Sequence, residues 1–210
     1  LAALRHITGD LTAVVTVADD GGSSGRLRSE MGVVPPGDLR MAVSALCEAS
    51  EWGETWRDVL QHRFHTEGPL DGHAVGNLLL AAIWQLHGDQ VAGLDLIGRL
   101  LGAAGRVLPM STEPLEIEAD VRQGDQPGSP TMLVRGQSRV AVTAGIVERV
   151  RLVPADAPAC PEAVAAIEAA DWVILGPGSW FTSVMPHLLL GGIADALHGT
   201  EARIALTLNL

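Results

Sequence analysis

Apolar residues recur along the chain at two spacings, which separate extended segments from helical ones. Continuous β-branched and apolar runs predict buried strands at 12–18, 171–175 and 202–208. Apolar residues three and four positions apart predict helices at 38–50, 52–64, 74–87, 91–104, 161–170 and 182–198, and residues 1–8 are typical of a helix tail. Asp38 is placed to cap the first of these helices, and the last is expected to break near Gly191. Strands that alternate with helices predict an α/β fold with a mainly parallel, doubly wound sheet.

The middle of the chain has a different pattern. Short segments rich in Val, Ile and Thr, separated by Gly, Gln and Pro, predict strands at 115–121, 131–135, 138–143 and 146–153. We therefore expect one α/β domain over residues 1–210, with a β-hairpin-rich insertion at about 113–153.

Composition removes several classes of function. All 14 basic residues are arginine, so a Schiff-base lysine, a P-loop lysine and pyridoxal-phosphate chemistry are excluded. The formal charge of −11 argues against nucleic-acid binding, which needs a basic surface. The chain has no run of 18 apolar residues, so no membrane insertion is expected, and its start is unlike a signal peptide, which predicts a cytoplasmic protein. The dinucleotide fingerprint Gly-x-Gly-x-x-Gly is also absent, which disfavours a nicotinamide dehydrogenase.

The clearest candidate chemistry follows the first predicted strand, in TVADDGGSSGRLR (16–28). Glycines allow backbone N–H groups to approach an anion, arginines can fork onto phosphate oxygens, and paired aspartates can hold Mg²⁺ or a ribose hydroxyl. The candidate ligand-binding residues are Asp19, Asp20, Gly21, Gly22, Ser23, Ser24, Arg26 and Arg28. The alternative is an ordinary Gly/Ser turn after a strand.

A second glycine loop follows the strand at 171–175. Gly176, Gly178, Ser179 and Thr182 would form an anion site, because a helix N-terminus with a glycine-rich turn favours negative charge. By itself this loop is equally consistent with a plain strand–helix turn. Its value is that two such loops at the carboxyl ends of strands can converge on one crevice.

Two further segments carry polar residues in apolar surroundings. PPGDLR (35–40) supplies Asp38 and Arg40, and Asp38 is alternatively only a helix cap. GHAVGN (72–77) supplies His73 and Asn77, four positions apart, which share a face if a helix begins near His73. Asn77 should have a polar partner inside so apolar a helix; the alternative is a capping His and a structural Asn. A zinc site that includes His73 is disfavoured by the loose histidine spacing.

Together these segments resemble the YvcK-like gluconeogenesis-factor family, within the wider superfamily of the 2-phospho-L-lactate transferase CofD. The matching segments are TVADDGGSSGRLR, PPGDLR, GHAVGN, RVLPMS (106–111) and LGPGSWFTS (175–183). The resemblance implies a Rossmann-like fold, a cytoplasmic bacterial protein and a pocket for a nucleotide or nucleotide-sugar, with UDP-N-acetylglucosamine as the ligand. It also implies a role in cell shape and envelope maintenance during gluconeogenic growth, and family analogy suggests a homodimer. The family continues beyond both ends of the chain, so we expect a truncated piece.

The first hypothesis is therefore a regulatory protein with no catalytic residue. In it, Gly21, Gly22, Ser23, Gly178 and Ser179 surround the diphosphate, and Asp19 and Asp20 take ribose or sugar hydroxyls, or a metal. Arg26, Arg28 or Arg40 balances charge and Asn77 fixes polar edges. The second hypothesis is a transferase of the CofD type, which moves a phospholactyl-like group from a nucleotide-diphosphate donor to a deazaflavin, with Mg²⁺ on Asp19, Asp20 or Asp38. A scaffold with a vestigial pocket is the third alternative.

Overall fold

The computed structural model describes residues 1–124, 126 and 128–207. The chain forms two compact units, each described by itself below. The first contains Leu1–Val17 and Gly21–Pro109, and the second contains Ala18–Asp20 and Met110–Leu210. The chain thus leaves the first unit for three residues, Ala18–Asp20, between the first strand and the first helix.

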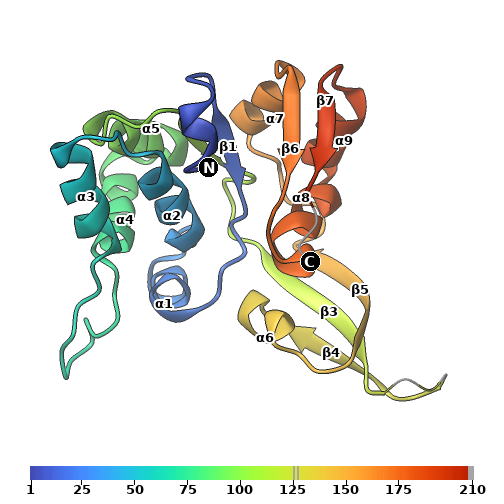
Figure 1. The fold of residues 1–210 in the computed structure, drawn as a ribbon. Coiled ribbons are helices and arrows are strands. Elements are labelled where there is room, and N and C mark those ends of the chain that lie inside the picture. Colours follow the sequence, from blue (N-terminus) through green and yellow to red (C-terminus); the bar gives the residue numbers. More distant parts are fainter. Residues whose placement is uncertain (125, 127, 208–210) are drawn as a thin grey trace. The chain divides into compact units, whose positions relative to one another are not determined.

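The first unit is mainly helical (Figure 1). Its elements in chain order are a 3₁₀ turn at Leu4–His6, β1 (Thr12–Val15), α1 (Gly22–Met31), α2 (Gly37–Leu46), α3 (Glu51–Gln61), α4 (Val75–His87), α5 (Gln90–Leu100) and β2 (Arg106–Pro109). β1 and β2 pair in parallel, with Thr12 opposite Arg106. α2 packs on both strands, and α4 packs on α3 and α5. Leu39, Leu46, Leu80 and Leu94 are fully buried in this core.

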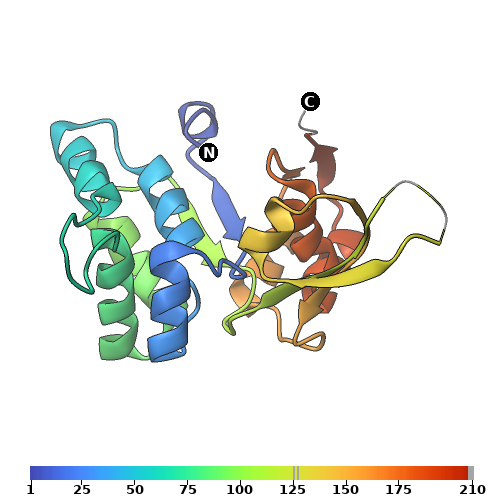
Figure 2. The ribbon, with the colours of Figure 1, turned by 90° about the horizontal axis from the view of Figure 1, so that it is seen from below.

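The second unit combines an antiparallel sheet with a parallel pair of strands. Its elements are β3 (Glu116–Arg122), β4 (Thr131–Arg135), α6 (Gln137–Ala141), β5 (Ile146–Val153), α7 (Pro161–Glu168), β6 (Trp172–Leu175), a π-helical turn at Trp180–Val184, α8 (Met185–Leu189), α9 (Gly191–Gly199) and β7 (Arg203–Leu206). β3 lies between β4 and β5, and α6 packs against β3 (Figure 2). β6 and β7 pair in parallel, and α7 packs against α9.

Parallel strand pairs joined through helices confirm the α/β fold class, and the antiparallel strands at 116–153 confirm the hairpin-rich insertion. One strand prediction is wrong, because residues 138–143 lie largely in helix α6. Gly136, at φ +95°, turns the chain out of β4, and Val140 is the only residue that α6 buries. The sequence did not predict helix α1 or strand β2.

The prediction that Asp38 caps its helix is also wrong. Pro36 is the N-cap residue of α2, and Asp38 lies inside the first turn, where a carboxylate still interacts favourably with the helix dipole. The helix ends at Leu46, short of the expected boundary. Ser50 instead caps α3, where its hydroxyl accepts a hydrogen bond from Gly53 N at 3.1 Å. The helix tail predicted at residues 1–8 is a single 3₁₀ turn at Leu4–His6.

Within the described residues, no helix has the length and apolar character needed to cross a membrane.

Candidate functional site

The first predicted loop opens directly into helix α1. Gly21 is the N-cap residue and Gly22 has φ +45°, a conformation that favours glycine. Ser23 and Ser24 follow in the first turn, and both side chains are buried. Because the first amides of an α-helix have no acceptor within the helix, this turn presents N–H groups together with two serine hydroxyls.

Asn77 holds both hydroxyls in place. Its Nδ2 donates to Ser23 Oγ at 3.0 Å and to Ser24 Oγ at 3.3 Å. The side chain is only 1% exposed, so these bonds provide the polar partners that the sequence required for it. The structure thus confirms that Asn77 is a satisfied buried amide, and its partners are the serines of the predicted loop.

Arg40 lies behind Asn77 and fixes its orientation. The Arg40 residue is 3% exposed, and its Nε donates to Asn77 Oδ1 at 2.9 Å. Gly76 makes this approach possible, since a Cβ there would lie 2.8 Å from Arg40 Cδ and 2.9 Å from Leu60 O. The segments PPGDLR and GHAVGN are therefore two halves of one buried contact.

His73 completes the cluster. Its Nδ1 lies 2.9 Å from Ser23 Oγ, and Ala74 N donates to the same oxygen at 3.4 Å. Burial lowers the pKa of His73, and the positive charge of Arg26 lowers that pKa further. Both effects favour the neutral imidazole of His73. We call Ser23, Ser24, Arg40, His73 and Asn77 the serine cluster.

Arg26 braces the loop next to this cluster. It donates to Pro69 O at 3.0 Å and to Asp71 O at 2.6 Å, so it ties α1 to the turn before His73. Asp19, Gly21, Arg28 and Asp38 also take part in interactions. The first unit thus gathers five of the predicted site residues in the serine cluster and braces a sixth, Arg26, alongside.

Asp20 has its partner in the second unit, to which it belongs. Its Oδ1 accepts a hydrogen bond from Ser138 N at 2.8 Å, so the carboxylate caps the start of α6. Gly136, the N-cap residue of α6, leaves the room for it, because a Cβ there would collide with Asp20 Oδ2.

The second predicted loop has a different geometry. Gly176 has φ +83° and precedes a cis Pro177, and a Cβ at Gly176 would lie 2.7 Å from Thr207 O. The chain then enters a five-residue π-helical turn, not the regular helix start that was predicted. Ser179 is exposed at the head of this turn, and Thr182 is buried, with its carbonyl oxygen 3.4 Å from Gln137 Nε2.

Sequence reasoning missed three contributors: Gly76, Gly136 and Ser138. Gly76 was within a quoted motif, but nothing in its spacing shows that an arginine stem passes across it. Gly136 lies between two predicted strands and Ser138 lies in the second of them, so their relation to Asp20 had no signal in the sequence.

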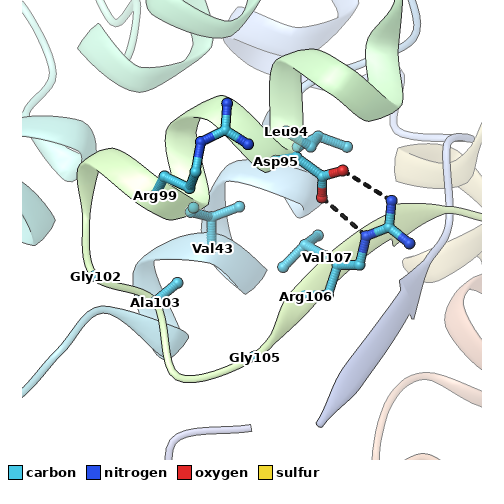
Figure 3. Close-up of a pocket in the computed structure, with 10 residues that line it drawn as sticks. Val43, Leu94, Asp95, Arg99, Gly102, Ala103, Gly105, Arg106 and Val107 are labelled. Carbon is cyan, nitrogen blue, oxygen red and sulfur yellow. Dashed lines mark hydrogen bonds and ion pairs between the residues drawn. The ribbon is translucent and has the colours of Figure 1, made fainter. Parts of the chain in front are cut away.

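The cavity drawn in Figure 3 is not at the predicted residues. It has a volume of about 270 Å³ and lies among α2, α5 and the start of β2, with Val43, Leu94 and Val107 as its apolar lining. Arg106 at its edge is already paired with Asp95, through contacts of 2.9 and 2.8 Å. None of the predicted site residues lines this cavity.

In the described part of the chain, no group of three or more His, Cys, Asp or Glu side chains is placed to hold a metal ion. Cys47 and Cys160 are buried free thiols, and burial raises the pKa of each, so neither is an activated thiolate.

Comparisons with known proteins agree with the pattern of motifs. A family model described as "2-phospho-L-lactate transferase CofD" matches residues 1–210. A relative from Mycobacterium tuberculosis is 58% identical over 210 residues, and the chain spans 61% of its length. The gluconeogenesis factor of Listeria monocytogenes is 38% identical over 192 residues, which are 91% of this chain and 56% of that protein.

A solved structure gives the same answer for the fold. The crystal structure of a UPF0052 family member from Bacillus halodurans matches with a TM-score of 0.87 and 38% identity, over 98% of this chain and 63% of that one. The match includes residues of both units, and the protein from Bacillus halodurans therefore has the same α/β fold. The chain belongs to the CofD family, and curated relatives within it are named gluconeogenesis factors.

Proposed function

We propose that this protein binds a nucleotide-sugar, with UDP-N-acetylglucosamine as the first candidate, and acts as a cytoplasmic regulator of cell shape and envelope maintenance during gluconeogenic growth. The observation that carries the proposal is the serine cluster. A helix N-terminus whose first turn is fixed through a buried amide and a buried guanidinium holds its N–H groups pre-organised for a phosphate group, and pre-organisation lowers the entropy cost of binding.

The composition of the cluster favours binding over catalysis. It holds no carboxylate to orient the histidine as a general base, its Ser23 hydroxyl is fully hydrogen-bonded within the cluster, and its arginine is engaged with Asn77. The relatives' name, gluconeogenesis factor, also denotes a metabolic role and not a reaction.

Isothermal titration calorimetry with UDP-N-acetylglucosamine tests the proposal. We expect saturable heat with the wild-type chain, and an affinity about tenfold lower for Ser24→Ala, equivalent to the loss of one hydrogen bond to a charged group. Ser29→Ala is the matched control, because Ser29 lies on the same helix and is exposed. Absence of heat at millimolar ligand, or equal losses in both variants, would contradict the proposal.

A second candidate is a transferase that uses a nucleotide-diphosphate donor and a deazaflavin acceptor, and the description of the matching family model favours it. Mg²⁺ would neutralise the diphosphate leaving group, held by Asp19, Asp20 or Asp38. Incubation with donor, acceptor and Mg²⁺, followed by mass spectrometry, decides it. A product that disappears with EDTA supports the transferase, and no product with either Mg²⁺ or Mn²⁺ rejects it.

A further inference from the structure

Arg40 sets the direction of the hydrogen bonds that Asn77 makes. A guanidinium only donates, so the Asn77 atom that faces Arg40 Nε must be the carbonyl oxygen. The other end of the amide is then NH₂, and it donates to the two serine hydroxyls. No flip of Asn77 is compatible with this arrangement.

The same logic fixes the tautomer of His73. Ser23 Oγ accepts from Asn77 Nδ2 at 3.0 Å and from Ala74 N at 3.4 Å, which uses both of its lone pairs. Its single proton must therefore point at His73 Nδ1, 2.9 Å away. His73 accepts that bond only as the neutral imidazole with its proton on Nε2.

We propose that His73 is a proton-sensitive positioning residue: neutral, it anchors the Ser23 hydroxyl, and protonated, it releases the first turn of α1 and weakens ligand binding there. The ligand-binding clause rests on the proposed function, whereas the positioning clause concerns the protein alone. Protonation at Nδ1 would direct an N–H at a hydroxyl oxygen that already accepts two bonds. One of the bonds to Asn77 or Ala74 would then have to break.

The charges around His73 favour the neutral form. Arg26 from α1 and Arg63 from the segment before the turn both oppose a positive imidazole, and Glu30, also on α1, favours it. Burial and the two arginines outweigh Glu30, so the pKa of His73 lies below its ordinary value of about 6.5. The folded chain therefore takes up this proton less readily than the unfolded chain. The stability held by neutral His73 is complete above about pH 6.5 and is lost as the pH falls from there through the lowered pKa.

Nuclear magnetic resonance on the unliganded chain tests the positioning clause. With ¹⁵N-labelled histidine, we expect Nδ1 of His73 to have the shift of an unprotonated nitrogen at pH 8, and the missing signals of His73→Asn assign it. As the pH falls, hydrogen exchange at the amides of Ala74 and Gly25, corrected for intrinsic rates, should become faster. The midpoint of this change should be that of the His73 titration. These amides report on the first turn of α1, because Ala74 N donates to Ser23 Oγ and Gly25 N donates to Gly21 O.

Two variants separate this proton from others. His73→Asn keeps an acceptor close to the place of Nδ1 and does not titrate, so its corrected exchange rates should not change with pH. His65→Asn removes an exposed histidine of the same unit and should keep the wild-type response. A protonated Nδ1 at pH 8, or exchange at Ala74 and Gly25 that ignores the His73 titration, would overturn the proposal.

Calorimetry at pH 8 and at one pH unit below the His73 midpoint measured by resonance tests the ligand-binding clause. The diphosphate diester of UDP-N-acetylglucosamine keeps its charge over this range, so a change in affinity reports on the protein. We expect the wild-type affinity to fall at least fivefold at the lower pH, and the affinity of His73→Asn, whatever its value, to be equal at both. Equal wild-type affinities would overturn the clause. No heat at either pH would reject the proposed function and this clause with it, while the resonance and exchange results still decide the positioning clause.

Discussion

The two glycine loops of this chain look alike in sequence and are built on different principles. At residues 21–24, two buried serine hydroxyls are held by a side-chain network that reaches Arg40. At residues 176–179, the backbone itself is constrained, with Gly176 at φ +83° against Thr207 O, and Ser179 is exposed. The first loop thus depends on hydrogen-bond chemistry and the second on the shape of its backbone.

The difference teaches where each loop is vulnerable. Substitutions that remove a polar side chain should destabilise the first loop and leave the second largely intact. An added methyl group should destabilise the second loop. A buried polar network is costly when it is partly satisfied, because each group left unpaired loses its solvation without compensation. A positive-φ glycine is costly to replace because an L-residue is strained there whatever its polarity.

Removing the centre of the network should have the largest effect. Asn77→Ala deletes three hydrogen bonds and leaves Arg40 Nε without its acceptor, so we expect the free energy of unfolding to fall by about 3 kcal/mol. Urea denaturation followed by circular dichroism measures it. Asn77→Asp is the matched variant, since it keeps the acceptor for Arg40 and loses only the donors, and its loss should be smaller. Equal losses would show that the serine bonds carry all of the effect.

The second loop should respond to a methyl group. In Gly176→Ala, the new Cβ would lie 2.7 Å from Thr207 O at a positive φ, and we expect a loss of about 2 kcal/mol. Gly191→Ala is the control from the same unit, because Gly191 has open space around its Cβ position. It should remain within about 0.5 kcal/mol of the wild type. A tolerated Gly176→Ala would break the comparison, because the backbone of the second loop would then not be constrained.

The sequence predicted the parts of the structure that depend on local periodicity. Helices α4 and α5 and strands β1 and β6 follow from the spacing of their apolar residues, and the need of Asn77 for a polar partner follows from its apolar helix. Helix α1 was not predicted, because its glycines and serines are typical of a loop. Its first turn is held by bonds from residues about fifty positions away, which no local pattern contains.

The inward direction of Arg40 was beyond the sequence for the same reason. Arginine is rarely buried without a partner, and the partner lies 37 positions along the chain and across a glycine that admits it. The predicted charge-balancing role of Arg40 at the ligand stays a prediction, as does the homodimer. The structure adds that the Arg40 side chain already has a positioning role toward Asn77.

A pair of serine substitutions should give the smallest and most direct contrast between the loops. Ser24→Ala removes a buried hydroxyl that accepts from Asn77 Nδ2 at 3.3 Å, so the free energy of unfolding should fall by about 1 kcal/mol. Ser179→Ala removes an exposed hydroxyl with no capping bond, so the change should stay within about 0.5 kcal/mol. Urea midpoints at pH 8, where His73 is neutral, compare the two without a contribution from its proton. Equal changes would mean that burial of the serine cluster contributes nothing to stability, and the distinction between a chemically held loop and a sterically held one would fail.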